Sequence, residues 1–143
     1  MTEKQKNWLM ATTILVIIVV SALIYVNDYK EHAVLNKQER EAYNTYLQYL
    51  DNYRENNSYT KEIADILGAY EFYQNMSYEG EVLKYIQDSV EDDINTDLLL
   101  YLHTDNVTIP KNQMEKFKEI VSQDFVLESN KDKFNKIKAS QIH

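Results

Sequence analysis

Residues 8–26, WLMATTILVIIVVSALIYV, contain no charged side chain. As an α-helix with a rise of about 1.5 Å per residue, a segment of this length reaches roughly 28 Å, close to the ~30 Å hydrocarbon core of a bilayer. Most of its side chains are Leu, Ile or Val, which enter a membrane with a gain of roughly 0.3–0.6 kcal/mol each. The segment therefore predicts a transmembrane helix, whose membrane-spanning residues include Trp8, Leu9, Ile14, Leu15, Val16, Ile17, Ile18, Val19, Val20, Leu23, Ile24, Tyr25 and Val26.

A cleaved signal peptide is the main alternative, because Val20, Ser21 and Ala22 offer small residues at the positions that a signal peptidase accepts. The apolar run continues to Val26, however, and is longer than the roughly 7–15 residues of a usual signal-peptide core. We therefore expect an uncleaved signal-anchor, and cleavage with secretion is the alternative that the sequence leaves open.

Positively charged residues on both sides of the apolar segment bear on its orientation. Lys4 and Lys6 precede it, whereas Lys30, Lys37 and Arg40 follow at increasing distance. A short N-terminal flank is easily retained in the cytoplasm, while a long acidic domain crosses the membrane largely regardless of its charge. We expect a single-pass protein of the cell membrane, with residues 1–7 in the cytoplasm and the C-terminal domain outside.

The composition of the 143-residue chain excludes several kinds of site. Without Cys, it has no disulfide, no thiol catalysis and no Cys-ligated metal. Its two glycines, Gly68 and Gly80, lie too far apart for a phosphate-binding loop or a dinucleotide fingerprint. Because the chain also has a single Pro, it lacks the turn residues of an all-β fold, and an all-α fold is expected. Thirteen Lys against two Arg is a bias typical of AT-rich coding, as in low-GC Gram-positive bacteria.

Helical signals continue beyond the membrane segment. Residues 27–56 contain no Gly or Pro, so the transmembrane helix is expected to continue as an amphipathic juxtamembrane helix. A turn is predicted at Asn56-Asn57-Ser58, and a second helix is expected to begin near Thr60. We expect residues 57–129 to form a small α-helical bundle domain, followed by a Lys-rich tail over residues 130–143 that frays.

Finer boundaries in that domain depend on single residues. Ser77 is a candidate N-cap for a third helix, and Asn95 or Thr96 for a short fourth helix in the Leu-rich run that follows. The alternative for residues 98–109 is a β-hairpin. Pro110 suits the first turn of a final helix, which would carry the periodic residues Met114, Phe117, Ile120, Val121, Asp124 and Phe125.

A stripe of apolar residues at helical spacing occupies the C-terminal half of the juxtamembrane helix. Its members are Tyr43, Tyr46, Leu47, Leu50 and Tyr53. We expect the stripe to pack on the rest of the domain, and a homo-oligomer through residues 39–53 is the alternative. The same five residues are the candidates for binding a partner, because Tyr is enriched in protein interfaces.

The densest group of acidic residues lies between Asp88 and Asp97. Pairs such as Asp93 and Asp97, four residues apart, would be neighbours on a helix, where two carboxylates can bind Ca²⁺ or act as acid and base. An EF-hand loop beginning at Asp93 fails, because Leu98 stands where Gly is required and Thr104 where Glu is required. We therefore interpret the run as a solvated helix face.

The three histidines are His32, His103 and His143, and they are too far apart in sequence to form a metal-binding motif. We assign no catalytic residue, no metal ligand and no cofactor. Residues 28–110 hold 17 acidic and six basic residues, which would repel phosphate, so nucleic acid is not expected as a partner.

These observations favour a non-enzymatic, membrane-anchored interaction protein of a bacterial envelope. Its acidic, Tyr-rich helical domain would dock another membrane or envelope protein. One alternative is an exclusion or toxin-immunity factor of a phage or plasmid. Another is a glycan-acting envelope enzyme that uses carboxylates among residues 91–97.

Overall fold

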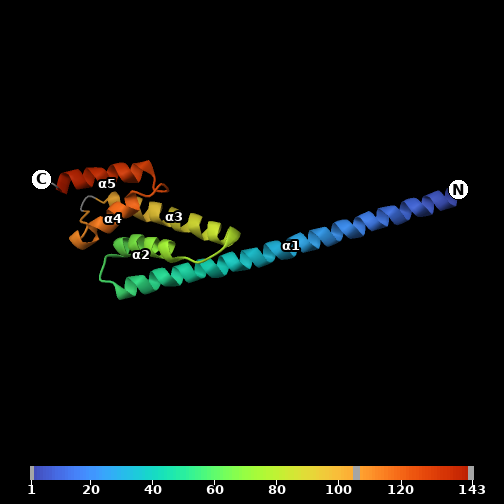
Figure 1. Ribbon diagram of the computed structural model, residues 1–143, viewed down its shortest axis with the longest axis horizontal. Coiled ribbons are helices and arrows are strands. Elements are labelled where there is room, and N and C mark those ends of the chain that lie inside the picture. The colour runs from blue at the N-terminus through green and yellow to red at the C-terminus, as the bar shows by residue number, and fades with distance from the viewer. Residues whose placement is uncertain (1, 105–106, 142–143) are drawn as a thin grey trace. The chain divides into compact units, whose positions relative to one another are not determined.

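The computed structural model describes residues 2–104 and 107–141, except for the side chains of residues 31, 32 and 138–141. Figure 1 shows its elements, which are α1 (Glu3–Asn56), α2 (Lys61–Asn75), α3 (Gly80–Leu102), the 3₁₀ helix η1 (Lys111–Gln113), α4 (Met114–Val121) and α5 (Glu128–Gln141). No strand occurs in this part of the chain, which confirms the all-α fold. The chain divides into two compact units, Met1–Gln38 and Glu39–His143, and α1 contributes its beginning to the first and its end to the second.

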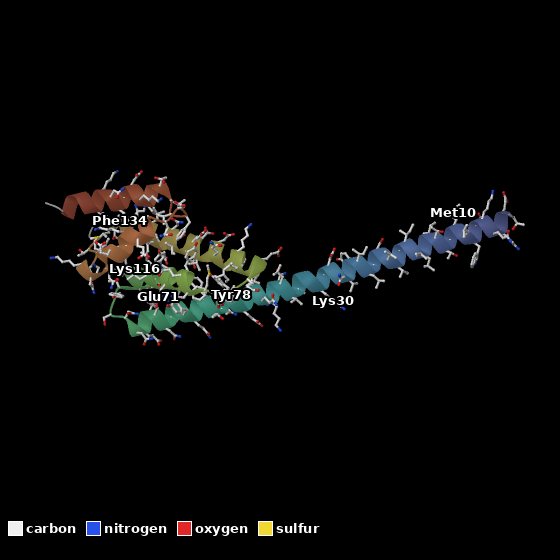
Figure 2. All side chains as sticks on the ribbon, viewed as in Figure 1. Met10, Lys30, Glu71, Tyr78, Lys116 and Phe134 are labelled. Carbon is white, nitrogen blue, oxygen red and sulfur yellow. The ribbon has the colours of Figure 1, made fainter. Side chains whose placement is uncertain are left out.

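The first unit is the N-terminal part of α1. An 18-residue window of this helix has a mean hydropathy of 2.7, and none of that window is buried. Figure 2 shows the side chains around Met10 extending freely from the helix. An apolar helix from the interior of a soluble protein would be mostly covered by other elements. The prediction of one N-terminal helix long and apolar enough to cross a membrane is confirmed.

The second unit is built around α2, which begins at Lys61 after the predicted turn. The eight consecutive residues 63–70 of α2 are all buried, so this stretch of the helix is covered on every side. Gly68 makes this possible on the side of α1, because a Cβ atom at this position would lie only 3.0 Å from Cγ of Tyr53. Gly68 thus allows the close approach of α1 and α2.

The third helix, α3, differs from the sequence prediction at both ends. Its N-cap is Glu79 and not Ser77, and it begins at Gly80, whose φ of 60° is a conformation that other residues rarely adopt. α3 then continues without a break to Leu102. The separate fourth helix capped by Asn95 or Thr96 is therefore wrong. Residues 98–102 of the alternative hairpin are helical, and residues 105 and 106 at its turn lie outside the described residues.

Asn95 has another role, as the point where α3 holds the segment between α4 and α5. Its side-chain amide donates to the Phe125 carbonyl oxygen at 3.0 Å, and its Oδ1 accepts from the Leu127 amide at 2.9 Å. The buried Asn130 donates from Nδ2 to both the backbone oxygen and Oδ1 of Asn95, each at 3.1 Å. These contacts join residues 30 to 35 positions apart in sequence. Capping rules consider only neighbouring residues, and for this reason they predicted a helix cap at Asn95.

The C-terminal region is more ordered than predicted. Residues 128–141 form α5, and Asn130 and Phe134 are buried, so the first residues of the tail predicted to fray belong to the core. α5 packs on α3 and α4, on the opposite side of the second unit from residues 39–56 of α1 (Figure 1). Pro110 precedes η1 and α4 ends at Val121, so the predicted final helix is shorter than expected, and Asp124 and Phe125 lie between α4 and α5.

Candidate interaction site

The predicted apolar stripe of α1 is divided between the core and the surface. Tyr46 and Leu50 are buried, with 0% and 6% of their surface exposed, so they are not available to a partner of the folded domain. Tyr43 and Tyr53 are half-buried, and Leu47 is 39% exposed. The stripe thus packs on the rest of the second unit, and Tyr43, Leu47 and Tyr53 are the members that still reach the surface.

Aromatic contacts account for the burial of the stripe. The ring centroid of Tyr46 lies 5.0 Å from that of Phe72 on α2 and 6.1 Å from that of Tyr43. Tyr49 lies 5.4 Å from the same Phe72 ring. Tilted rings at these separations gain about 0.5–1.5 kcal/mol each beyond their buried area. The Tyr-rich composition is therefore used in part to pack α1 on α2.

Two acidic residues of α3 lie beside the end of α1. Asp97 and Asp93 are half-buried there, and the Tyr46 hydroxyl, which forms no hydrogen bond of normal geometry, lies beside Asp93. Burial is the main cause that raises the pKa of Asp93 above its usual range. Burial, together with repulsion from Asp65 and Asp93, raises the pKa of Asp97 to about 6.

Arg54 and Lys61 partly balance the negative charge of this region. Arg54 pairs with the buried Asp65 of α2 through Nε, and its Nη1 lies 3.1 Å from Oδ1 of Asp51. The hydrogen bond that Arg54 donates to Asp65 is the main cause that raises the pKa of Arg54. Arg54 also attracts Asp97 and opposes the rise of its pKa. The arrangement joins α1, α2 and α3 around a partly neutralised group of carboxylates.

These carboxylates do not form a site for a metal ion. Among the described residues, no group of three or more His, Asp or Glu side chains could hold one. Glu91 is held by the Tyr73 hydroxyl, which donates to its Oε1 at 3.3 Å. His103 contacts Lys133, and His143 lies outside the described residues.

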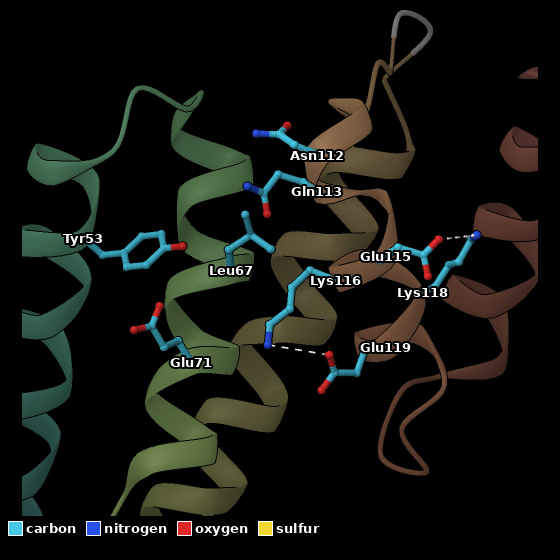
Figure 3. Close-up of a pocket in the computed structure, with 9 residues that line it drawn as sticks. All are labelled: Tyr53, Leu67, Glu71, Asn112, Gln113, Glu115, Lys116, Lys118 and Glu119. Carbon is cyan, nitrogen blue, oxygen red and sulfur yellow. Dashed lines mark hydrogen bonds and ion pairs between the residues drawn. The ribbon is translucent and has the colours of Figure 1, made fainter.

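The second unit carries a surface hollow of about 700 Å³ between the end of α1, α2 and α4 (Figure 3). Tyr53 of α1 and Glu71 of α2 line one side of the hollow, and Lys116 and Glu119 of α4 line the other. Leu67 of α2 also lines it. A second hollow of about 420 Å³ continues along α1 and shares Tyr53 and Glu71 with the first. We call the two together the Tyr53–Glu71 groove.

Two tyrosine hydroxyls approach Glu71 at the junction of the two hollows. Burial is the main cause that raises the pKa of Tyr49 to about 12, and the neighbouring Glu71 carboxylate adds to it by disfavouring the phenolate. Burial first, and then Glu71, also raises the pKa of Tyr53. Both phenols therefore stay protonated at neutral pH and present O–H donors beside the carboxylate.

Sequence reasoning did not identify this groove. Its walls come from residues near 50, 70 and 115, and no spacing rule brings these three segments together. Tyr53 was a candidate only as part of the apolar stripe, while Glu71, Asn112 and Lys116 gave no local signal. The sole hint is Gly68, a glycine inside an otherwise helical pattern, which indicates a close approach of another element.

Comparisons of this chain with protein-family models, with curated proteins and with solved structures found no match.

Proposed function

We propose that this chain is a single-pass, membrane-anchored, non-enzymatic interaction protein of a bacterial envelope, whose acidic helical domain docks another envelope protein. One observation carries the proposal. The apolar part of α1 is fully exposed, whereas Ala42, Tyr46 and Leu50 of the same helix belong to the core of the second unit. An exposed apolar helix of this length is costly in water and stable in a bilayer, and here it is covalently joined to a folded domain.

The continuity of α1 also favours retention of the anchor. Cleavage after Ala22 would leave Leu23, Ile24 and Val26 exposed at a new helical N-terminus, with no membrane to cover them. The uncleaved chain keeps these side chains at the edge of the hydrocarbon core, beside Tyr25, whose amphipathic ring suits the interface. The proposed orientation places Lys4 and Lys6 in the cytoplasm and the second unit outside.

Support for docking comes from apolar and aromatic side chains that the fold leaves on the surface. Leu47 of α1 is 39% exposed and Tyr85 of α3 is 41% exposed. Tyr43 lies near Tyr85 and Asp93, and these neighbours contribute, after burial, to raising its pKa. Leu47, Tyr43 and Tyr85 thus leave apolar and aromatic side chains at the surface, and Tyr is enriched among the residues that dominate binding in protein interfaces.

An enzyme acting through the acidic run is less well supported. Asp93 and Asp97 lie against Tyr46 and Arg54 between helices, and neither lines the Tyr53–Glu71 groove, where a substrate would have room to bind. The interaction protein is therefore the function we propose.

Because the chain has no Cys, single cysteines can report its orientation. We would introduce Thr2→Cys in one variant and Ser129→Cys, at an exposed site on the second unit, in another. In intact cells, a membrane-impermeant maleimide is expected to label position 129 and to label position 2 only after permeabilisation. Labelling of position 2 alone in intact cells would show that the N-terminus is outside and the second unit is in the cytoplasm.

Docking is tested in the same cells with a photo-crosslinking amino acid at Leu47. The matched control carries it at Leu127, which is 52% exposed and also on the second unit. We expect a single crosslinked protein from position 47 in the membrane fraction and none from position 127. No product at position 47, or the same products from both positions, would contradict docking through this surface.

A further inference from the structure

The aromatic rings of the Tyr53–Glu71 groove are partly covered by their neighbours. One face of Tyr53 rests on Gly68, and its ring stacks with that of Tyr49 at 6.4 Å and 29°. Tyr49 also packs on Phe72, with 5.4 Å between the ring centroids. A sugar binds aromatic residues by stacking on an exposed ring face, and the contacts with Gly68 and Phe72 reduce the face area that these two rings offer. Their hydroxyl groups lie near Glu71.

The charges that line the groove are neutralised with one exception. Lys118 pairs with Glu115 at 2.8 Å, and Lys116 lies 3.6 Å from Glu119 and donates to Gln74 at 3.1 Å. Glu71 is exposed and forms no ion pair among the described residues. Its carboxylate, at the junction of the two hollows, is therefore the position at which the groove attracts a cation.

Amide side chains occupy both ends of the groove. Asn52 and Asn56 line it on α1, and Asn112 lines it at η1. An amide side chain carries both a donor and an acceptor, which matches the alternating N–H and C=O groups of an extended peptide. The combination of amides with a single uncompensated carboxylate fits a peptide that carries a basic side chain.

We propose that the Tyr53–Glu71 groove is a docking site for an extended basic segment of the partner protein, with an Arg or Lys side chain bound to Glu71. The inference rests on the proposed function, because it names the chemistry of the docking partner. Glu71, flanked by the Tyr49 and Tyr53 hydroxyls, accepts charge-assisted hydrogen bonds, and a guanidinium can form two of them in parallel. The excess of acidic residues over residues 28–110, 17 against six basic, attracts the same partner at longer range.

The test is a binding titration with the full chain in detergent micelles. Lys111→Cys, at an exposed position next to Asn112, carries an environment-sensitive fluorophore in every variant. The probe is a capped hexapeptide of alternating Gly and Arg. Glu71→Gln removes the charge and keeps the shape of the side chain, while Glu62→Gln removes an exposed charge from the same helix outside the groove. Far-UV circular dichroism confirms that all variants are equally helical.

We expect Glu71→Gln to weaken binding of the Gly–Arg peptide about tenfold, and Glu62→Gln to change it less than about twofold. Equal losses in the two variants, tighter binding of a Gly–Glu hexapeptide, or binding of chitotriose in place of the Gly–Arg peptide would each overturn the inference. No saturable binding at about 5 mM peptide would also overturn it.

The two proposals fail separately. If position 47 crosslinks a partner in cells but the Gly–Arg peptide does not depend on Glu71, the groove assignment is wrong while docking stands. If the peptide depends on Glu71 but position 47 crosslinks nothing, the groove assignment stands and docking through Leu47 does not.

Discussion

Replacing Asp97 with Asn should stabilise the second unit at neutral pH. Asp97 is half-buried on α3, and the nearby Asp65 and Asp93 repel its charge. Arg54 and Lys61 attract it but offset only part of this penalty. As a result its pKa rises from the ordinary 3.8 to about 6. Asn is close to Asp in size and removes the charge without opening a cavity.

The size and the pH range of the effect follow from this pKa. A pKa that is higher in the folded state means that folding is favoured when the group is protonated, and that this benefit is lost as the pH rises through about 6. The rise corresponds to about 3 kcal/mol at 1.36 kcal/mol per pH unit, and we reduce this to about 1–2 kcal/mol because water screens a half-buried group. Asp97→Asn should therefore raise the free energy of unfolding by about 1–2 kcal/mol at pH 7.5 and change it little at pH 4.

Urea unfolding of the chain in detergent micelles measures the difference in the free energy of unfolding between Asp97→Asn and the parent chain. Unfolding is followed by tyrosine fluorescence and by far-UV circular dichroism. Most of the tyrosines lie in the second unit, so their signal follows its unfolding. Asp92→Asn, at an exposed position of the same helix, is the matched control and should change stability by less than about 0.5 kcal/mol at either pH. An Asp97→Asn variant that is less stable than the parent at pH 7.5, or equally stabilised at both pH values, would refute the reasoning.

Three further substitutions test the interior of the second unit by the same urea assay. Arg54→Met leaves the buried Asp65 without its partner and should lower the free energy of unfolding by about 2 kcal/mol. Adding Asp65→Asn to this variant should recover part of the lost stability, and no recovery would contradict the pairing of Arg54 with Asp65. Asn95→Ala removes the hydrogen bonds that hold the segment before α5 and should cost about 2–3 kcal/mol, whereas the exposed Asn52→Ala should cost less than about 0.5 kcal/mol. Phe134→Ala should cost about 3 kcal/mol because its ring is buried, and a neutral result would show that α5 is not part of the core.

Local signals were sufficient for the first half of the fold. The uncharged run of residues 8–26, the absence of helix breakers up to residue 55 and the turn at Asn56-Asn57-Ser58 are properties of neighbouring residues. The structure accordingly has one helix from Glu3 to Asn56 and a second from Lys61. Tertiary packing has little influence on such strong local patterns.

The C-terminal half was harder to predict because distant residues decide it. Asn95 looks like a helix cap by its type, but its side chain is engaged by residues 125, 127 and 130. Asn130 is polar and lies in a Lys-rich segment, yet it is buried because Asn95 accepts its hydrogen bonds. The composition of this Lys-rich segment predicts that it is exposed to solvent. Its hydrogen bonds to Asn95 make Asn130 part of the buried interior.

The candidate site shows the same division. Spacing identified the stripe from Tyr43 to Tyr53, but it could not say that Tyr46 and Leu50 would be covered while Leu47 would stay exposed. The Tyr53–Glu71 groove depends on α1, α2 and α4 meeting in space. No single segment of the sequence carries that information.

We propose above that α1 anchors an intact chain in a membrane. The most direct measurement is the mass of the chain recovered from the membrane fraction of expressing cells after an alkaline wash, which removes peripheral proteins. We expect the uncleaved 143-residue chain in the washed membranes. A chain shortened near Ala22, or a full-length chain in the soluble fraction, would contradict it.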